Sequence, residues 1–169
     1  MKTTKMECVA CDNAEVLKGK RTIHKYKECG LDYVTLTGIL EFKCLKCGEV
    51  YLEIPNLQQL HHLIAKALMK KSTNLNGTEV RYLRKELGYS TEQFSKLISY
   101  DSKSLSRIEN GHQKITSTFD RLIRMAYASG KRDLDYDLHD YLLGKDGGLC
   151  RHLELTLKGD EWNLKVQAA

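Results

Sequence analysis

The sequence lacks the long apolar runs and the catalytic motifs that would place it in several large classes of protein. No apolar stretch approaches the roughly 18 residues that a membrane-spanning helix needs. The opening residues, MKTTKMECVAC, also lack the apolar core of a signal peptide. A Walker phosphate loop, an HExxH metalloprotease helix and a Ser/His/Asp grouping are missing as well. These absences predict a cytoplasmic protein that needs no membrane and is not an enzyme.

The composition is that of an ordinary globular protein with a modest excess of basic residues. The chain has 169 residues, of which 41% are hydrophobic and 29% charged, and this length suits one large or two small domains. Its net charge of +5 is unevenly spread. Residues 71–130 hold ten Lys and Arg against six Asp and Glu, whereas residues 131–169 hold six against eight. An anionic partner would therefore prefer the middle segment.

Four of the six cysteines fall in two CxxC pairs, which are Cys8/Cys11 and Cys44/Cys47. Two residues between cysteines let one turn aim both thiolates at the same ion, and two such pairs complete a tetrahedral set of four sulfurs. Because that set leaves no open position for a catalytic water, it predicts one structural Zn²⁺ per chain. Buried neutral cysteines are one alternative. A redox CxxC is another, although no βαβ pattern surrounds either pair.

The segment that carries these cysteines is predicted to be a small β-rich domain over residues 1–54. Apolar and polar residues alternate in three stretches of its second half, which is typical of strands. Because the segment has few large apolar residues, it needs a metal to hold its fold. A helix and a short polar linker are predicted to follow over residues 55–74.

The pattern becomes helical from residue 75, and we predict a compact bundle of five short helices over residues 75–148. Its second and third helices are the most informative. Ser90 and Gln93 form a capping box, and Asp101 offers a carboxylate to cap a helix over residues 102–109. That helix has a narrow apolar edge and a polar, basic outer face, as reading the DNA major groove requires. An ordinary helical hairpin on a solvated surface would have the same spacing.

Residues 149–169 are predicted to form a β-hairpin with one apolar face, made by Leu153, Leu155, Leu157, Trp162, Leu164 and Val166. A lone hairpin is marginally stable in water. Its apolar face should therefore cover the chain's own bundle or another subunit, and we expect a subunit interface. The predicted fold class is α+β, with a β-rich zinc domain, a linking helix, a helical bundle and a C-terminal hairpin.

Two groups of residues carry a resemblance to a known family. The pair CVAC…CLKCG and the block LNGTEVRYLRKELGYSTEQFSKLISYDSKSLSRIENG resemble the MqsA/YgiT-type antitoxin and regulator family. Its members join an N-terminal four-cysteine zinc domain to an Xre/Cro-type, lambda-repressor-like helix-turn-helix. The likeness covers residues 7–128 and implies that the helical bundle binds DNA.

The resemblance also implies roles for individual residues. The zinc ligands would be Cys8, Cys11, Cys44 and Cys47. The residues that read base edges would be Ser102, Lys103 and Arg107, and the phosphate contacts would be Thr91 and Asn110. Arg84 and Glu109 would form an ion pair that joins the first helix of the bundle to the third. The toxin-neutralising branch carries asparagine at the position of Lys103, so its operator sequence is not assumed for this chain. The tail after Gly130 has no counterpart in the short antitoxins, which leaves both the toxin partner and the mode of dimerisation open.

The function predicted from these observations is a sequence-specific DNA-binding repressor, plausible as the antitoxin of a toxin–antitoxin pair. A homodimer on a palindromic double-stranded operator would double the number of bases read. The zinc domain would then be a structural module that is available to bind a toxin. The alternative is a zinc-ribbon adaptor that binds protein or RNA and uses the helical bundle to dimerise. A flat salt dependence of binding to duplex DNA would favour the adaptor.

Overall fold

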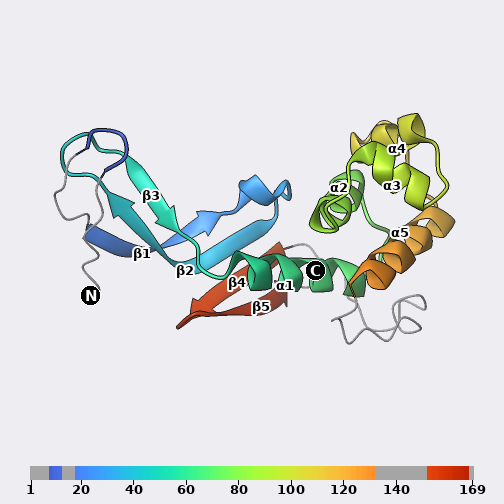
Figure 1. The fold of residues 1–169 in the computed structure, drawn as a ribbon. Helices are drawn as coiled ribbons and strands as arrows, with labels where there is room; N and C mark the ends of the chain where they lie inside the picture. The colour runs from blue at the N-terminus through green and yellow to red at the C-terminus, as the bar shows by residue number, and fades with distance from the viewer. Residues whose placement is uncertain (1–7, 13–17, 132–151, 168–169) are drawn as a thin grey trace.

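The computed structural model describes residues 8–12, 18–131 and 152–167, which form an elongated molecule (Figure 1). A strand-rich arm lies at one end and a helical bundle at the other, with one long helix between them. This arrangement confirms the predicted α+β class. The fifth helix predicted for the bundle, which Leu134, Leu138 and Leu142 mark and which ends near Gly144, lies outside the described residues. The predicted domain limits at residues 54, 74 and 148 stay predictions.

The arm is a five-stranded sheet built around its second strand. The strands are β1 Lys18–Lys25, β2 Val34–Lys43, β3 Val50–Glu53, β4 His152–Lys158 and β5 Glu161–Gln167, and the short 3₁₀ helix η1 Lys27–Cys29 follows β1. β1 pairs antiparallel with β2 along most of its length. On its other edge, the C-terminal half of β2 pairs antiparallel with β3, and the N-terminal half of β2 pairs in parallel with β4. β5 completes the sheet as the antiparallel partner of β4.

The C-terminal hairpin, β4 and β5, is covered by its own chain. Leu153 and Leu155 are fully buried, and Trp162 is 4% exposed, in the same apolar cluster as the inner face of the linking helix. The Trp162 indole N–H donates to the carbonyl of Pro55 at 2.8 Å, and its backbone N–H donates to Gln59 at 2.9 Å. The expectation that a second subunit buries this face is therefore wrong for these three side chains, because pairing with β2 brings the hairpin onto the chain's own helix.

The helices are α1 Leu57–Lys70, α2 Gly77–Glu86, α3 Thr91–Leu97, α4 Ser102–Glu109 and α5 Ser117–Gly130. The caps expected from the sequence are present. Ser90 and Gln93 form the capping box of α3, and an Asp101 carboxylate oxygen accepts the Ser104 N–H at 2.7 Å to cap α4. In the described part of the chain, every helix is too short or too polar to cross a membrane.

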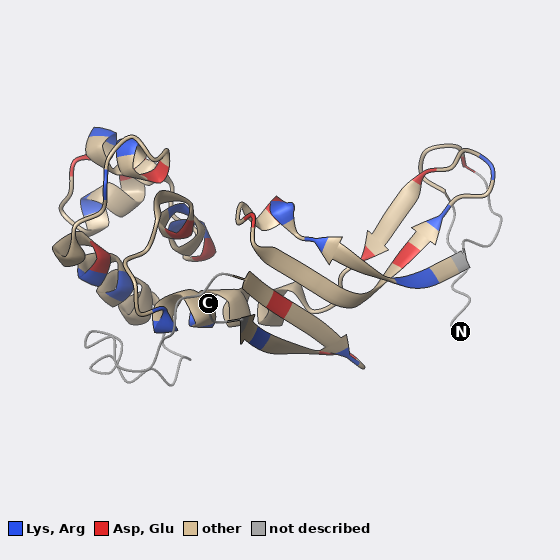
Figure 2. Ribbon diagram, turned by 180° about the vertical axis from the view of Figure 1, so that it is seen from behind, with Lys and Arg blue, Asp and Glu red and all other residues tan. Residues whose placement is uncertain are grey.

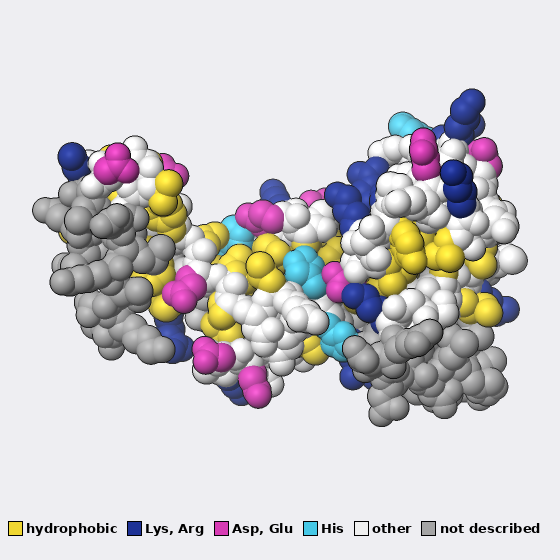
Figure 3. Space-filling view, viewed as in Figure 1, with side chains coloured by type: hydrophobic (Ala, Val, Ile, Leu, Met, Phe, Trp, Pro, Cys, Tyr) yellow, Lys and Arg dark blue, Asp and Glu magenta, His cyan; other side chains and the backbone are white. Residues whose placement is uncertain are grey.

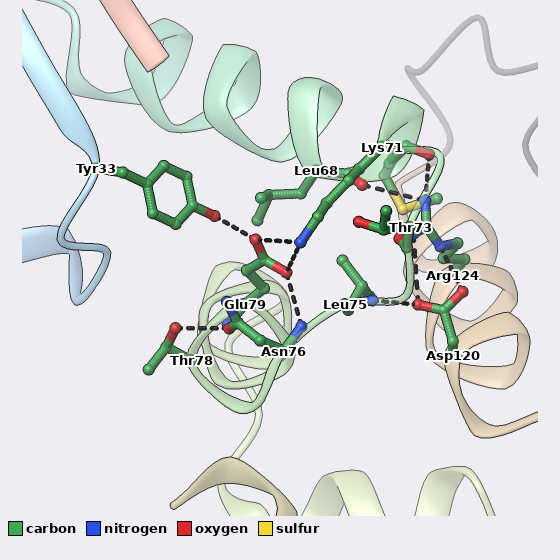
Figure 4. Close-up of polar contacts among 11 residues, drawn as sticks. Tyr33, Leu68, Lys71, Thr73, Leu75, Asn76, Thr78, Glu79, Asp120 and Arg124 are labelled. Carbon is green, nitrogen blue, oxygen red and sulfur yellow. Dashed lines mark hydrogen bonds and ion pairs between the residues drawn. The ribbon is translucent and has the colours of Figure 1, made fainter. Parts of the chain in front are cut away.

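The connection between arm and bundle is held by buried polar groups (Figure 4). Glu79 in the first turn of α2 is 1% exposed and accepts from Lys71 at 2.8 Å, from the Asn76 N–H at 2.7 Å and from the Tyr33 hydroxyl of the arm. Arg124 of α5 is also buried and donates to backbone carbonyls at the end of α1 and in the linker. One buried apolar cluster runs from the sheet through α1 into the bundle. The segment between α1 and α2 is therefore fixed by contacts on both sides.

Candidate metal centre and nucleic-acid interface

The four cysteines of the two CxxC pairs come together at the far end of the arm. Their sulfur atoms all lie within 4.8 Å of one another, with 3.5 Å between Cys8 and Cys47 and 3.7 Å between Cys11 and Cys44. Four sulfurs placed tetrahedrally about 2.3 Å from one zinc ion would be roughly 3.8 Å apart. The donor set therefore fits a single tetrahedral ion of the kind that thiolates prefer. The prediction that these four cysteines come together in a geometry able to hold one metal ion is confirmed.

Each pair lies in a tight turn whose backbone aims both sulfurs inward. In the first turn, the Asp12 N–H donates to the Cys8 carbonyl at 2.8 Å. In the second, the Gly48 N–H donates to the Cys44 carbonyl at 3.0 Å. Gly48 has a φ of +80°, a conformation that glycine adopts without strain. The glycine after the second pair is thus part of the ligand geometry.

Tyr51 of β3 is a neighbour of the cysteine group that sequence reasoning did not find. Its hydroxyl lies 3.2 Å from the Cys8 sulfur, and this hydrogen bond is the largest of several contacts that together lower the pKa of the Cys8 thiol to about 6. The backbone N–H of Cys47 likewise lowers the pKa of the Cys44 thiol. Both effects favour the thiolate, the form that binds metal. Among the described residues, the buried cluster at this end consists of Cys8, Cys44 and Phe42, so a bound ion would contribute much of what holds the two turns together.

At the other end of the molecule, α3 and α4 form the predicted pair of short helices, joined by a turn in which Ser99 has a φ of +51°. Leu105 and Ile108 of α4 are buried against the bundle, whereas Lys103 and Arg107 are exposed. Lys103 and Arg107 are four residues apart and therefore share one face of the helix. Within the described residues, neither side chain makes a hydrogen bond or an ion pair to the rest of the chain. Their charged ends are available to a partner.

The other residues that the resemblance assigned to DNA lie at the two ends of these helices. Ser102 is the first residue of α4 and Thr91 the first of α3, and both are half-buried. Asn110 is exposed and follows the last turn of α4. The structure therefore brings Ser102, Lys103 and Arg107 onto one helix, with Thr91 on the neighbouring helix.

Arg84 and Glu109 meet in a bidentate ion pair that fixes α4 on α2. The Arg84 Nε and Nη2 atoms each donate to a different Glu109 carboxylate oxygen at 2.7 Å, and the side chains are 8% and 3% exposed. The third guanidinium nitrogen donates to the Tyr89 carbonyl at 2.8 Å, in the loop before α3. One buried side chain thus holds both helices of the helix-turn-helix in place.

Arg81 is a second arginine at this junction, and sequence reasoning missed it. Its Nη2 donates to the Asn110 side-chain oxygen at 2.6 Å, and its Nε lies 3.5 Å from Glu109. The Asn110 amide nitrogen in turn donates to the Ser106 carbonyl at 2.8 Å. The spacing contained a signal, because Arg81 precedes Arg84 by three residues and so shares the helix face that meets Glu109.

Positive charge is spread over the bundle and also occurs on β1 (Figure 2). Lys and Arg side chains project from the upper end of the bundle, where α4 lies in the same view of Figure 1 (Figure 3). Hydrophobic side chains are visible on the front of the bundle. Three large apolar residues in the described part of the bundle are exposed at the surface, Leu97 by 54%, Met125 by 46% and Tyr89 by 36%.

The comparison with known protein families gives one result. The family described as the antitoxin component of bacterial toxin-antitoxin system, MqsA, matches residues 6–128, which is more than half of the chain. The matched region includes the four cysteines and α1 to α4, and it ends before the C-terminal hairpin. No curated protein and no solved structure matches the chain. The family match confirms the resemblance found in the sequence.

Proposed function

We propose, because the chain belongs to the MqsA antitoxin family, that it is a sequence-specific DNA-binding repressor and the antitoxin of a toxin–antitoxin pair. The observation that carries the DNA-binding part is the outer face of α4. Lys103 and Arg107 are exposed there, and their charged ends have no ion-pair partner in the described part of the chain. The helix itself is held by a buried ion pair rather than by contacts of its outer face. An anionic groove is the partner that this arrangement suits.

The proposed reading of DNA assigns different tasks to different side chains. Arg107 would present its planar fork to a guanine edge, and Ser102, at the start of α4, would contact a neighbouring base. Lys103, one turn before Arg107, would reach a base or a phosphate. Thr91 and Asn110 would contact phosphates on either side of the groove, where contacts set position and carry no sequence information.

The binding unit that we propose is a homodimer on a palindromic double-stranded operator. One helix of this length reads only a few bases, so a single site would be too frequent in a genome to be specific. A two-fold dimer places two recognition helices one helical turn apart and doubles the site.

The arm would have two tasks, metal binding and toxin binding. We propose one structural Zn²⁺ per chain, held by the four cysteines, because their sulfurs form a closed four-ligand set with no place for a substrate. The arm projects from the bundle (Figure 1), so its far end is accessible to a toxin while α4 lies on DNA. As a repressor bound to operator DNA, the protein would act in the cytoplasm.

The DNA-binding proposal is tested by selecting a preferred duplex from a random library with the zinc-loaded protein. Binding is then titrated by gel shift on the selected duplex and on a scrambled duplex of the same composition. Arg107→Ala should lower affinity for the selected duplex about 5- to 150-fold, the equivalent of about 1–3 kcal/mol, and should leave binding to the scrambled duplex nearly unchanged. Lys165→Ala, which removes one exposed cation from the hairpin, is the charge-matched control. Equal losses on both duplexes would contradict the assignment of Arg107.

The antitoxin part needs a separate experiment. The product of a small open reading frame next to the gene should arrest growth when expressed alone, should be harmless when expressed with this chain, and should copurify with it. If no such product exists and binding to duplex DNA does not change with salt, the adaptor hypothesis replaces the repressor.

A further inference from the structure

We infer that Arg81 is a phosphate-contacting residue of the DNA interface and that Asn110 acts mainly by positioning it. This inference rests on the proposed DNA binding and adds a residue of α2 to the interface. It also changes the task of Asn110, which the family resemblance would make a direct phosphate contact. The two residues meet where α2 passes the end of α4, with 2.6 Å between Arg81 Nη2 and Asn110 Oδ1.

The charges at the junction of α2 and α4 do not balance. Glu109 is already neutralised by Arg84, whose two donors take one carboxylate oxygen each at 2.7 Å. Arg81 reaches the same carboxylate only through Nε at 3.5 Å. Two guanidinium groups thus share one carboxylate, and one positive charge is left over. Arg84 is 8% exposed and cannot reach a ligand, whereas Arg81 is 37% exposed, so the uncompensated charge is presented by Arg81.

That uncompensated charge lies at the end of the recognition helix, beside Asn110. Lys103 and Arg107 occupy positions i and i+4 of α4, and Asn110, the residue that caps the end of the helix, follows at i+7 on the same side. Asn110 lies seven residues beyond Lys103, or about 10 Å along the axis. The major groove is about 12 Å wide. If the start of α4 reads bases, a guanidinium bound to Asn110 lies near the edge of the groove, where the phosphates are.

The Asn110 amide already has hydrogen-bond partners within the chain at both its oxygen and its nitrogen. Its oxygen accepts from Arg81, and its nitrogen donates to the Ser106 carbonyl at 2.8 Å and lies 3.4 Å from the Ser106 hydroxyl. The amide is therefore engaged on both sides within the chain. The Arg81 guanidinium, in contrast, has donors left over after its bonds to Asn110 and Glu109. Being held in this way, it loses little conformational freedom when a phosphate binds.

The experiment measures binding of the full-length, zinc-loaded protein to a random-sequence duplex as a function of salt. This probe reports phosphate contacts and needs no knowledge of the operator. The variants are Arg81→Ala, Arg81→Lys, Asn110→Ala and the double variant Arg81→Ala/Asn110→Ala, with Lys165→Ala as the remote cation control. Thermal melting of each variant checks that the bundle is folded.

Arg81→Ala should reduce the slope of log K against log salt concentration by about 0.9, one phosphate contact, and should lower affinity about 5- to 10-fold at 0.1 M salt. Arg81→Lys should retain the slope because it retains the charge. Asn110→Ala should lower affinity by a smaller factor, and in the Arg81→Ala background it should have no further effect. A merely structural role for Asn110 would change melting but not the slope.

Two outcomes would overturn the inference while leaving the proposed function intact. One is a wild-type slope in Arg81→Ala. The other is an Asn110→Ala effect that is the same with and without Arg81, which would make Asn110 itself the phosphate contact. A wild-type protein whose binding is independent of salt would instead remove the proposed DNA binding, and the inference with it.

Discussion

Replacing Glu109 by alanine should strongly destabilise the helix-turn-helix. The change removes both carboxylate oxygens that accept from the Arg84 guanidinium, which is 8% exposed, and leaves that charge buried without a counterion. Breaking a buried ion pair from one side costs about 3–5 kcal/mol. For a chain of this size, each 1 kcal/mol lowers the melting temperature by about 2–4 °C, so the expected loss is roughly 6–20 °C.

The control for this prediction is Glu92→Ala, because Glu92 is an exposed acid in the first turn of α3. Both variants lose one carboxylate, yet Glu92→Ala should change stability by only about 0.5 kcal/mol or less. Melting is followed by helical circular dichroism on the zinc-loaded, full-length protein. The double variant Arg84→Met/Glu109→Leu should recover much of the loss, since it removes the buried charge as well. Melting temperatures of Glu109→Ala and Glu92→Ala within about 2 °C of each other would refute the reasoning.

Three further changes test other parts of the molecule. Metal analysis of the unchanged protein should give one zinc per chain, and Cys44→Ser should abolish it and make the arm sensitive to protease. Cys29→Ser leaves the four-cysteine group intact and should keep the metal. Equal metal content in the two variants would rule the site out. Trp162→Ala should lower the free energy of unfolding by about 3–5 kcal/mol because the side chain is only 4% exposed. Val166→Ala should cost far less, since Val166 is 46% exposed. Similar losses in the two variants would mean that the hairpin is not packed on α1. Glu79→Ala should destabilise the connection between arm and bundle by about 3–5 kcal/mol, since it leaves Lys71, whose side chain is only 10% exposed, without its carboxylate partner. Hydrogen exchange should rise at the start of α2, and unchanged exchange there would contradict this.

The sequence by itself determined the parts whose signals are local. The CxxC spacing identified all four cysteines of the metal-binding group, because one turn fixes the direction of both sulfurs. The bounds of α4 followed from Asp101 and the two apolar residues of its edge, since a cap and a helical period act within about one turn. Alternating apolar residues likewise predicted the C-terminal hairpin. The family resemblance then placed Arg84 opposite Glu109, a contact that helix periodicity alone would not have identified.

Only the tertiary structure decided which distant segments meet. Val34 of β2 pairs with Leu153 of β4 in parallel, and a hairpin's alternation indicates that one face is buried but not what buries it. In the same way, Tyr51 lies against Cys8, and Tyr33 against Glu79, across long stretches of chain. The physical reason is that such contacts depend on how whole elements pack to bury apolar surface. The residues next to each partner in the sequence therefore do not predict the contact.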